Sequence, residues 1–207
     1  MWMKRWVHVL AVALLSGVAI AQPADSTYDR SVWIEALGKR DYKEWTRLVD
    51  ESIRANYPSV ATALLTEVAL EPRTLPPSAQ QGAAIPEFEI QAIRYLANGY
   101  RNKRLNPPVD QLRARTKVLM SKPSAADMTA MMALADFRNP ADAPFLARIA
   151  SDADPNRYRA AILALRQMCL PAANAELVTL KQAPGTSEAK KDFIASSGDV
   201  SRVACAK

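Results

Sequence analysis

Residues 139–169 read NPADAPFLARIASDADPNRYRAAILALRQMC, and this stretch decides the fold. Each half opens near a proline, Pro140 and Pro155, which is tolerated in the first turn of a helix because its missing N–H would be unpaired there. Apolar side chains then recur at helical spacing in the second half: Tyr158, Ala161, Ile162, Leu165 and Cys169. The stretch therefore predicts two antiparallel helices joined by an Asp/Pro turn.

The same pattern recurs along the chain at the spacing of one helical hairpin. A shift of 31 residues places residues 131–134, MMAL, on residues 162–165, ILAL, and places Pro140 on Pro171. A shift of 33 places Asn106-Pro107 on Asn139-Pro140. Repetition at this period indicates hairpins that stack because none of them can bury its apolar face alone. The alternative is coincidence in an alanine-rich helical protein.

A family resemblance rests on the same stretch. Its order of residues resembles a HEAT-like, armadillo-type repeat, in which an Asp-Pro turn joins two helices and an Arg-Ala-Ala run follows: Pro140, Ala143-Pro144, Leu146, Ile149, Asp152, Asp154-Pro155, Arg159-Ala160-Ala161 and Ala164-Leu165. With the repeats, the resemblance implies an all-α fold, a short right-handed α-solenoid of about ten helices in stacked hairpins, HEAT-like in its C-terminal half. It also implies an extended protein-binding surface without catalytic residues.

The first residues have the pattern of a secretory signal peptide. Lys4 and Arg5 precede an apolar run over residues 9–20, and residues 19–21, AIA, are small enough for a signal peptidase. Assuming a bacterial source, we expect cleavage between Ala21 and Gln22 and a periplasmic or secreted protein. An uncleaved anchor is the alternative, but twelve residues are short for a bilayer, so we expect no stable membrane insertion.

The remaining chain divides into two predicted parts. Residues 22–28 are expected to be a disordered leader, and residues 29–207 a single helical-repeat domain. Within it, residues 71–85 read EPRTLPPSAQQGAAI, which has no periodicity and three prolines. We predict a long loop there, either a binding loop or a plain connection. Its candidate partner-binding residues are Arg73, Gln80 and Gln81.

Histidine chemistry is excluded once the signal peptide is removed, because His8 is the chain's one histidine. Ser-His-Asp and Cys-His sites are ruled out, as are zinc sites that need imidazole, and two cysteines cannot form a Cys-rich metal site. We therefore predict no enzymatic activity and no cofactor or metal. A cell-wall hydrolase that uses carboxylates alone is the less favoured alternative. Glu51-Ser52 resembles the start of a lytic transglycosylase site, but the Gly-Leu-Met-Gln segment of those enzymes is absent.

The two cysteines, Cys169 and Cys205, predict a disulfide in an exported chain. This bond would tie the end of the chain to the central hairpin. The alternative is a pair of free, buried thiols.

Basic residues gather between positions 101 and 117. After cleavage the chain has 25 Lys and Arg against 21 Asp and Glu, a net charge of about +4 that is too mild to indicate nucleic acid. The run is either a solvated face or a docking surface for an acidic protein or an anionic polymer. The candidate partner-binding residues are Arg101, Lys103, Arg104, Arg113, Arg115 and Lys117.

Four methionines lie between positions 120 and 132. They predict either an adaptable binding groove or, as the favoured interpretation, the filling of an irregular core.

These observations predict a non-catalytic periplasmic protein-binding α-solenoid, a scaffold or adaptor. The alternative is an immunity protein that neutralises an antibacterial toxin delivered to the periplasm.

Overall fold

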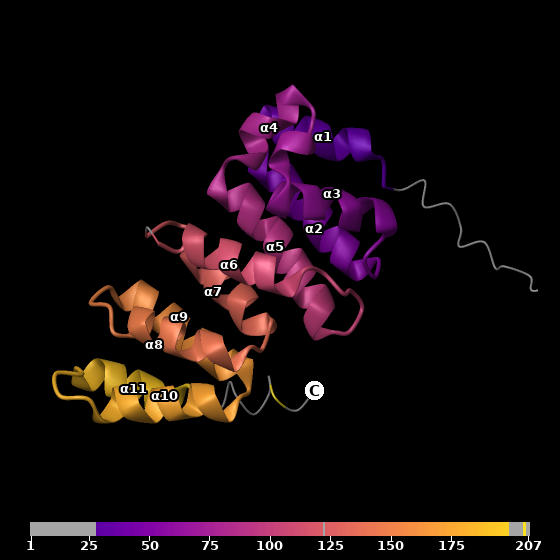
Figure 1. Ribbon diagram of the computed structural model, residues 1–207. Helices are drawn as coiled ribbons and strands as arrows, with labels where there is room; N and C mark the ends of the chain where they lie inside the picture. Colours follow the sequence, from indigo (N-terminus) through magenta and orange to yellow (C-terminus); the bar gives the residue numbers. More distant parts are fainter. Residues whose placement is uncertain (1–27, 122, 199–204, 206–207) are drawn as a thin grey trace, which may run out of the picture.

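The structure is a computed structural model that describes residues 28–121, 123–198 and 205 (Figure 1). Over these residues the chain forms eleven α-helices, two short 3-10 helices and no strand, so the all-α prediction is confirmed. None of the described helices is both long and apolar enough to cross a bilayer. The signal peptide and almost all of the predicted leader, residues 1–27, lie outside the described residues.

The helices of the structure have the following bounds. The α-helices are α1 (Arg30–Lys39), α2 (Tyr42–Arg54), α3 (Ser59–Leu70), α4 (Pro77–Ala83), α5 (Pro86–Arg101), α6 (Val109–Leu119), α7 (Asp127–Asp136), α8 (Ala143–Ala150), α9 (Pro155–Met168), α10 (Pro171–Gln182) and α11 (Glu188–Ser196). The 3-10 helices are η1 (Pro72–Thr74) and η2 (Pro140–Asp142).

The helices succeed one another along the length of the molecule, from α1 and α4 at one end to α10 and α11 at the other (Figure 1). Helix α3 packs on α5, α5 packs on α7, and α7 packs on α9. Helices α8 and α9 also pack on each other, as predicted for residues 139–169. The four helices α3, α5, α7 and α9 therefore form a continuous row in which each packs on the next.

The hairpin of α8 and α9 begins slightly differently from the prediction. Asn139 acts as a cap, because its side chain accepts the N–H of Ala141 at 3.0 Å. However, it caps η2, and α8 starts only at Ala143. Asp154 caps α9 by accepting the N–H of Asn156 at 2.9 Å, and Pro155 occupies the first helical position as expected.

The core changes character along the row of helices. Near the N-terminus it is aromatic: Trp33 and Trp45 meet edge to face with ring centroids 5.3 Å apart, and Trp45 donates its indole N–H to the Phe88 carbonyl at 3.2 Å. Further along, fully buried aliphatic side chains such as Leu134 and Ile162 take over. One continuous core therefore joins the helices instead of separate cores.

The predicted disulfide is present between Cys169 and Cys205, with Cα atoms 5.5 Å apart. Cys169 caps the C-terminus of α9 in the left-handed conformation, with φ of 55°. The bond therefore attaches Cys205 to the end of a central helix, and the alternative of two free thiols is wrong.

The prediction of a loop at residues 71–85 is wrong. The segment contains η1 and then α4, which packs on α1. The buried face of α4 consists of Ala79, Gly82 and Ala83, so it carries almost no hydrophobic pattern to read. Small residues are needed there because the helices approach closely: a Cβ on Gly82 would lie 2.0 Å from the backbone oxygen of Leu37.

We expect the Gly82→Ala substitution to lower the free energy of unfolding by about 1–3 kcal/mol, because a backbone oxygen cannot move aside as a flexible side chain can. Gly198→Ala is the matched control, since no atom of the described residues lies within 4 Å of the added Cβ. Urea titration of the two variants measures the difference. Equal midpoints would show that α1 and α4 do not approach this closely.

Candidate partner-binding groove

The predicted basic residues on α5 and α6 are largely ion-paired inside the molecule. Arg101 donates to Asp136 at 2.6 Å, which links α5 to α7. Arg113 donates to both oxygens of the completely buried Asp142, at 2.6 and 2.9 Å, and Lys117 pairs with the same carboxylate. These three cations therefore neutralise buried acids and join neighbouring helices.

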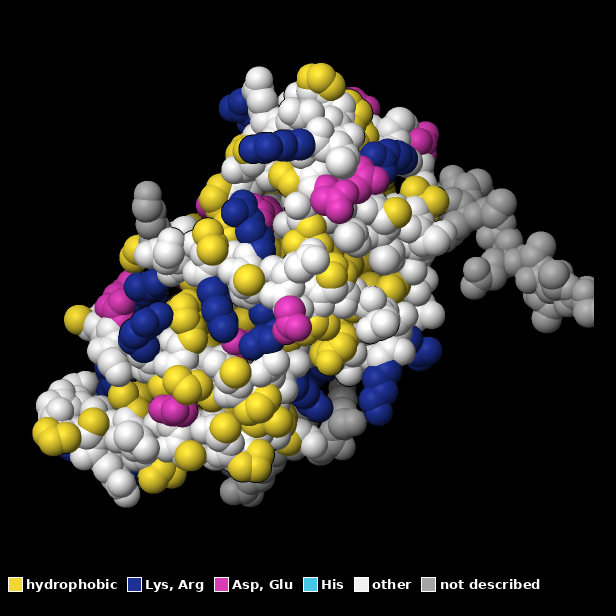
Figure 2. Space-filling model, viewed as in Figure 1, with side chains coloured by type: hydrophobic (Ala, Val, Ile, Leu, Met, Phe, Trp, Pro, Cys, Tyr) yellow, Lys and Arg dark blue, Asp and Glu magenta, His cyan; other side chains and the backbone are white. Residues whose placement is uncertain are grey.

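The other three predicted basic residues are all exposed, and one of them is ion-paired. Arg115 donates to the buried carboxylate of Glu89 at 2.7 Å. Lys103 and Arg104 are exposed in the turn after α5 and make no ion pair with another described residue. On the face that Figure 2 shows, Lys and Arg side chains are spread among acidic and hydrophobic ones and do not form one patch. Binding of a partner by these six residues stays a prediction, and the structure gives four of them another role.

The three candidate residues of the former loop lie around α4. The amide of Gln80 donates to the carbonyls of Arg73 and Leu75, at 3.2 and 2.8 Å, so this side chain holds η1 against α4. Gln81 accepts from Arg40 at 2.8 Å. Arg73 is exposed. These contacts stabilise the end of the molecule and bring no shared site together.

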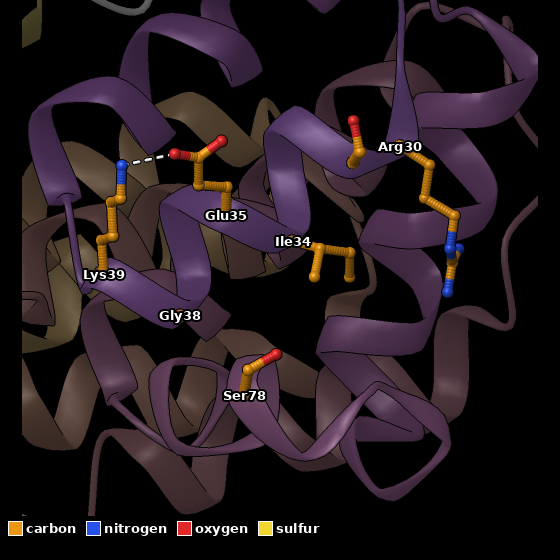
Figure 3. A pocket seen from close by; sticks show the side chains of 7 residues that line it. Arg30, Ile34, Glu35, Gly38, Lys39 and Ser78 are labelled. Carbon is orange, nitrogen blue, oxygen red and sulfur yellow. Dashed lines mark hydrogen bonds and ion pairs between the residues drawn. The ribbon is translucent and has the colours of Figure 1, made fainter.

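A shallow hollow of about 570 Å³ lies beside this segment, between α1 and α4 (Figure 3). Ile34 points into it, while Glu35 and Lys39 pair with each other along its edge. Arg30, at the other side, is paired with Glu67 at 2.6 Å. The hollow contains one large apolar side chain, and its charged side chains are already paired. It therefore offers few groups that could bind a ligand.

A better-equipped groove of about 370 Å³ crosses three successive helices, α5, α7 and α9. Its apolar lining consists of Met128, Met132, Ala133, Ala160 and Leu163. Its polar lining consists of Arg94, Asn98, Thr129, Asp136 and Gln167. Ordinary ligand sites have this composition, a mostly apolar surface with a few placed polar groups, and volumes of about 300–1,000 Å³.

The methionines divide between the two predicted roles. Met120 and Met131 are buried in the core, as the favoured interpretation had it. Met128 and Met132, four residues apart on α7, line the groove instead. Met128 is 61% exposed, more than any other large hydrophobic side chain in the described part of the chain.

One wall of the groove is built on the buried carboxylate of Asp136. It accepts from Arg101 at 2.6 Å and from the side-chain amide of Gln167 at 2.7 Å. Because a carboxylate can only accept, the NH₂ of Gln167 must face it. The side-chain carbonyl oxygen of Gln167 then has no protein partner among the described residues, and it remains as an acceptor at the groove.

The opposite wall carries a side chain with spare donor capacity. The Oδ1 atom of Asn98 accepts from Asn102 at 2.9 Å and from the hydroxyl of Tyr57. Burial raises the pKa of Tyr57 above its ordinary value near 10, so its phenol keeps the proton that it donates. The NH₂ group of Asn98 pairs with no residue in the described ranges, which leaves a donor at the groove.

A polar chain extends the groove toward α2. Arg94 donates to Asp50 at 3.1 Å and to Gln91 at 3.0 Å, and the amide of Gln91 donates to the hydroxyl of Tyr42 at 2.8 Å. Tyr42 is 41% exposed. Hydrogen bonds therefore lead from Arg94, at the groove, through the buried Gln91 to the exposed Tyr42.

The carboxylate suggested for a hydrolase lies elsewhere and is occupied. Glu51 pairs with Arg47 on α2 at 2.5 Å, and Ser52 is buried with its hydroxyl donating to the Leu48 carbonyl at 2.9 Å. Neither residue lines the groove. Over residues 28–121, 123–198 and 205, no cluster of His, Cys, Asp and Glu has the arrangement of a metal site.

The residues that form the groove were not predicted together from the sequence. Met128 and Met132 gave the one signal, through their spacing of four residues. Asn98, Leu163 and Gln167 come from helices that are brought together only by packing. Comparisons with family models, curated proteins and solved structures find no match to the chain, so the HEAT-like resemblance rests on residues 139–169.

Proposed function

We propose that this chain is a non-catalytic protein-binding module, a right-handed α-solenoid of stacked hairpins, and that a partner protein occupies the groove across α5, α7 and α9. The observation that carries the proposal is the exposure of Met128 beside the half-buried Met132 and Leu163. Exposed apolar side chains gathered in a polar-rimmed hollow mark binding sites on soluble proteins. Methionine suits such a site because its unbranched, polarisable side chain adapts to the partner.

The row of packed helices supports the solenoid part of the proposal. Helices α5, α7 and α9 pack side by side and all three line one groove, as expected when equivalent helices of successive hairpins form a row. The resemblance of residues 139–169 to a HEAT-like repeat points the same way.

We further propose that the protein is exported to the periplasm, after cleavage between Ala21 and Gln22. The disulfide between Cys169 and Cys205 supports export, because such bonds persist in oxidising compartments. A disulfide-tied scaffold whose buried acids are ion-paired would also suit an immunity protein. That second function differs from an adaptor only in its partner, a secreted toxin.

Site-specific photo-crosslinking in living cells tests the proposal. A photoreactive phenylalanine analogue at Met128 is expected to capture a discrete partner, whereas the same analogue at Val178 is not, because Val178 is 55% exposed but lies on α10 outside the groove. Leu163→Glu should abolish the Met128 crosslink, and Val178→Glu should leave it unchanged. Mass spectrometry of the captured protein then separates a toxin from a resident envelope protein.

Two outcomes would contradict the proposal. Equal capture from positions 128 and 178 would show that the groove is not selective. Capture that survives Leu163→Glu, in a variant whose thermal unfolding matches that of the parent, would place the partner elsewhere.

A further inference from the structure

We infer that the occupant of the groove is an uncharged segment of the partner in an extended conformation, with its backbone hydrogen-bonded by Asn98 and Gln167. This inference rests on the proposed function and adds the conformation and chemistry of the bound segment. It comes from the hydrogen-bonding capacity left at the groove, the distance across the helices and the pairing of the groove's charges.

The spare hydrogen-bonding groups fit an extended backbone. Gln167 on α9 offers a carbonyl oxygen to a peptide N–H, and Asn98 on α5 offers an NH₂ to a peptide carbonyl. An extended segment carries such unpaired groups at every residue, whereas a helix satisfies nearly all of its own. Thr129 on α7 also lines the groove, and its hydroxyl can both donate and accept.

The span of the groove sets the length of the segment. Packed helix axes are about 8–10 Å apart, so the two steps from α5 to α9 cover about 16–20 Å. An extended chain rises about 3.3 Å per residue, so about five or six residues cross the groove. Alternate side chains of that segment point to one side, which would seat two or three of them against Met128, Met132 and Leu163.

The charges at the groove favour an uncharged segment. Arg94 is paired with Asp50 at 3.1 Å, and Asp136 is paired with Arg101 at 2.6 Å. A charged side chain brought into the groove would lose hydration without gaining a free counter-ion there. The partner surface inferred here therefore differs from the acidic partner that the basic run had suggested.

The test uses a phage-displayed library of random twelve-residue peptides, panned against the chain as purified after export. Selected peptides are made synthetically, and alanine is substituted at each position in turn. We expect apolar anchor residues at every second position of the peptide (i and i+2). Alanine at any one of them should weaken the affinity of the peptide about tenfold or more. Aspartate or lysine at an anchor position should weaken the affinity at least as much as alanine does.

The hydrogen bonds are tested from both sides. Asn98→Asp keeps the oxygen that Asn102 and Tyr57 need but removes the donor. Gln167→Met removes the acceptor together with the NH₂ that bonds Asp136, so its affinity is measured under conditions where its thermal unfolding shows it fully folded. Each substitution is expected to weaken binding about 3- to 10-fold. Asn174→Asp, on the exposed side of α10, is the charge control and should change nothing. Methylation of single backbone nitrogens in the peptide tests the bond to Gln167 with the protein unaltered, and one position should lose a similar factor.

The outcomes separate the two proposals. Anchors spaced by three or four residues, in a peptide that becomes helical on binding, would overturn the extended conformation while leaving the groove as the binding site. Binding insensitive to every backbone methylation would overturn it as well. If no selected peptide loses binding on Leu163→Glu, both the inference and the proposed function fail.

Discussion

Replacing Arg113 by methionine is expected to lower the free energy of unfolding by about 3–5 kcal/mol, the usual cost of removing one partner of a buried ion pair. Asp142 is completely buried, and Arg113 contacts both of its oxygens. Lys117 also pairs with this carboxylate, but it is a single point charge and cannot replace a planar guanidinium that bonds both oxygens. The variant would leave a buried charge only partly compensated.

Urea titration and thermal unfolding measure this loss, which should lower the melting temperature by about 10 °C in a domain of this size. Lys103→Met removes an exposed cation that has no ion pair with another described residue, and it should change stability by less than about 0.5 kcal/mol. Adding Asp142→Asn to Arg113→Met should restore part of the loss, because the uncompensated charge then disappears. An Arg113→Met variant as stable as the Lys103→Met control would show that the pair contributes nothing.

Much of the secondary structure could be predicted because prolines mark helix starts locally. Pro86, Pro155 and Pro171 each occupy the first position of a helix, namely α5, α9 and α10. The rule works because a first-turn proline loses no hydrogen bond and already has a helical φ. It needs no knowledge of which helices pack together.

Helix α4 shows where local rules fail. It too begins at a proline, Pro77, but its buried side is made of Ala79, Gly82 and Ala83, which give no hydrophobic period. What stabilises it is close contact with the backbone of α1 at Leu37, about 45 residues earlier in the chain. A window of sequence cannot contain that contact.

The basic run shows the same limit for charges. Arg101 and Asp136 are 35 residues apart, Arg113 and Asp142 are 29 apart, and Arg115 and Glu89 are 26 apart. Each separation exceeds the length of one helix, so the sequence next to each cation does not contain the carboxylate that it pairs with. Packing of α5, α6, α7 and η2 is what supplies their carboxylates.

The groove depends on the same tertiary information. Both Met131 and Met132 are apolar, and so are their neighbours Ala133 and Leu134, so the sequence of α7 does not show which side faces outward. Asn98 and Gln167 lie on different helices, 69 positions apart. Their polar groups line one groove only because α7 lies between α5 and α9.

The arrangement of ion pairs also bears on how the groove can work. Asp136 forms part of the groove and is held by Arg101 from α5, while Gln167 from α9 is oriented by that same carboxylate. A fixed carboxylate therefore fixes the acceptor that the peptide would use. Such preorganisation lowers the entropic cost of binding, which suits a site that would recognise a short segment through few contacts.

Reduction of the disulfide, or the double substitution Cys169→Ser and Cys205→Ser, is expected to lower the free energy of unfolding by roughly 3–4 kcal/mol. The bond joins residues 36 positions apart, and closing a loop of that length removes about this much chain entropy from the unfolded state. Urea titration with and without dithiothreitol measures the effect. The reductant should shift the midpoint of the parent protein to that of the double variant and leave the double variant unmoved. Because the bond closes α10 and α11 into one covalent loop with the end of α9, equal midpoints for the oxidised parent and the double variant would show that these helices are held by packing alone.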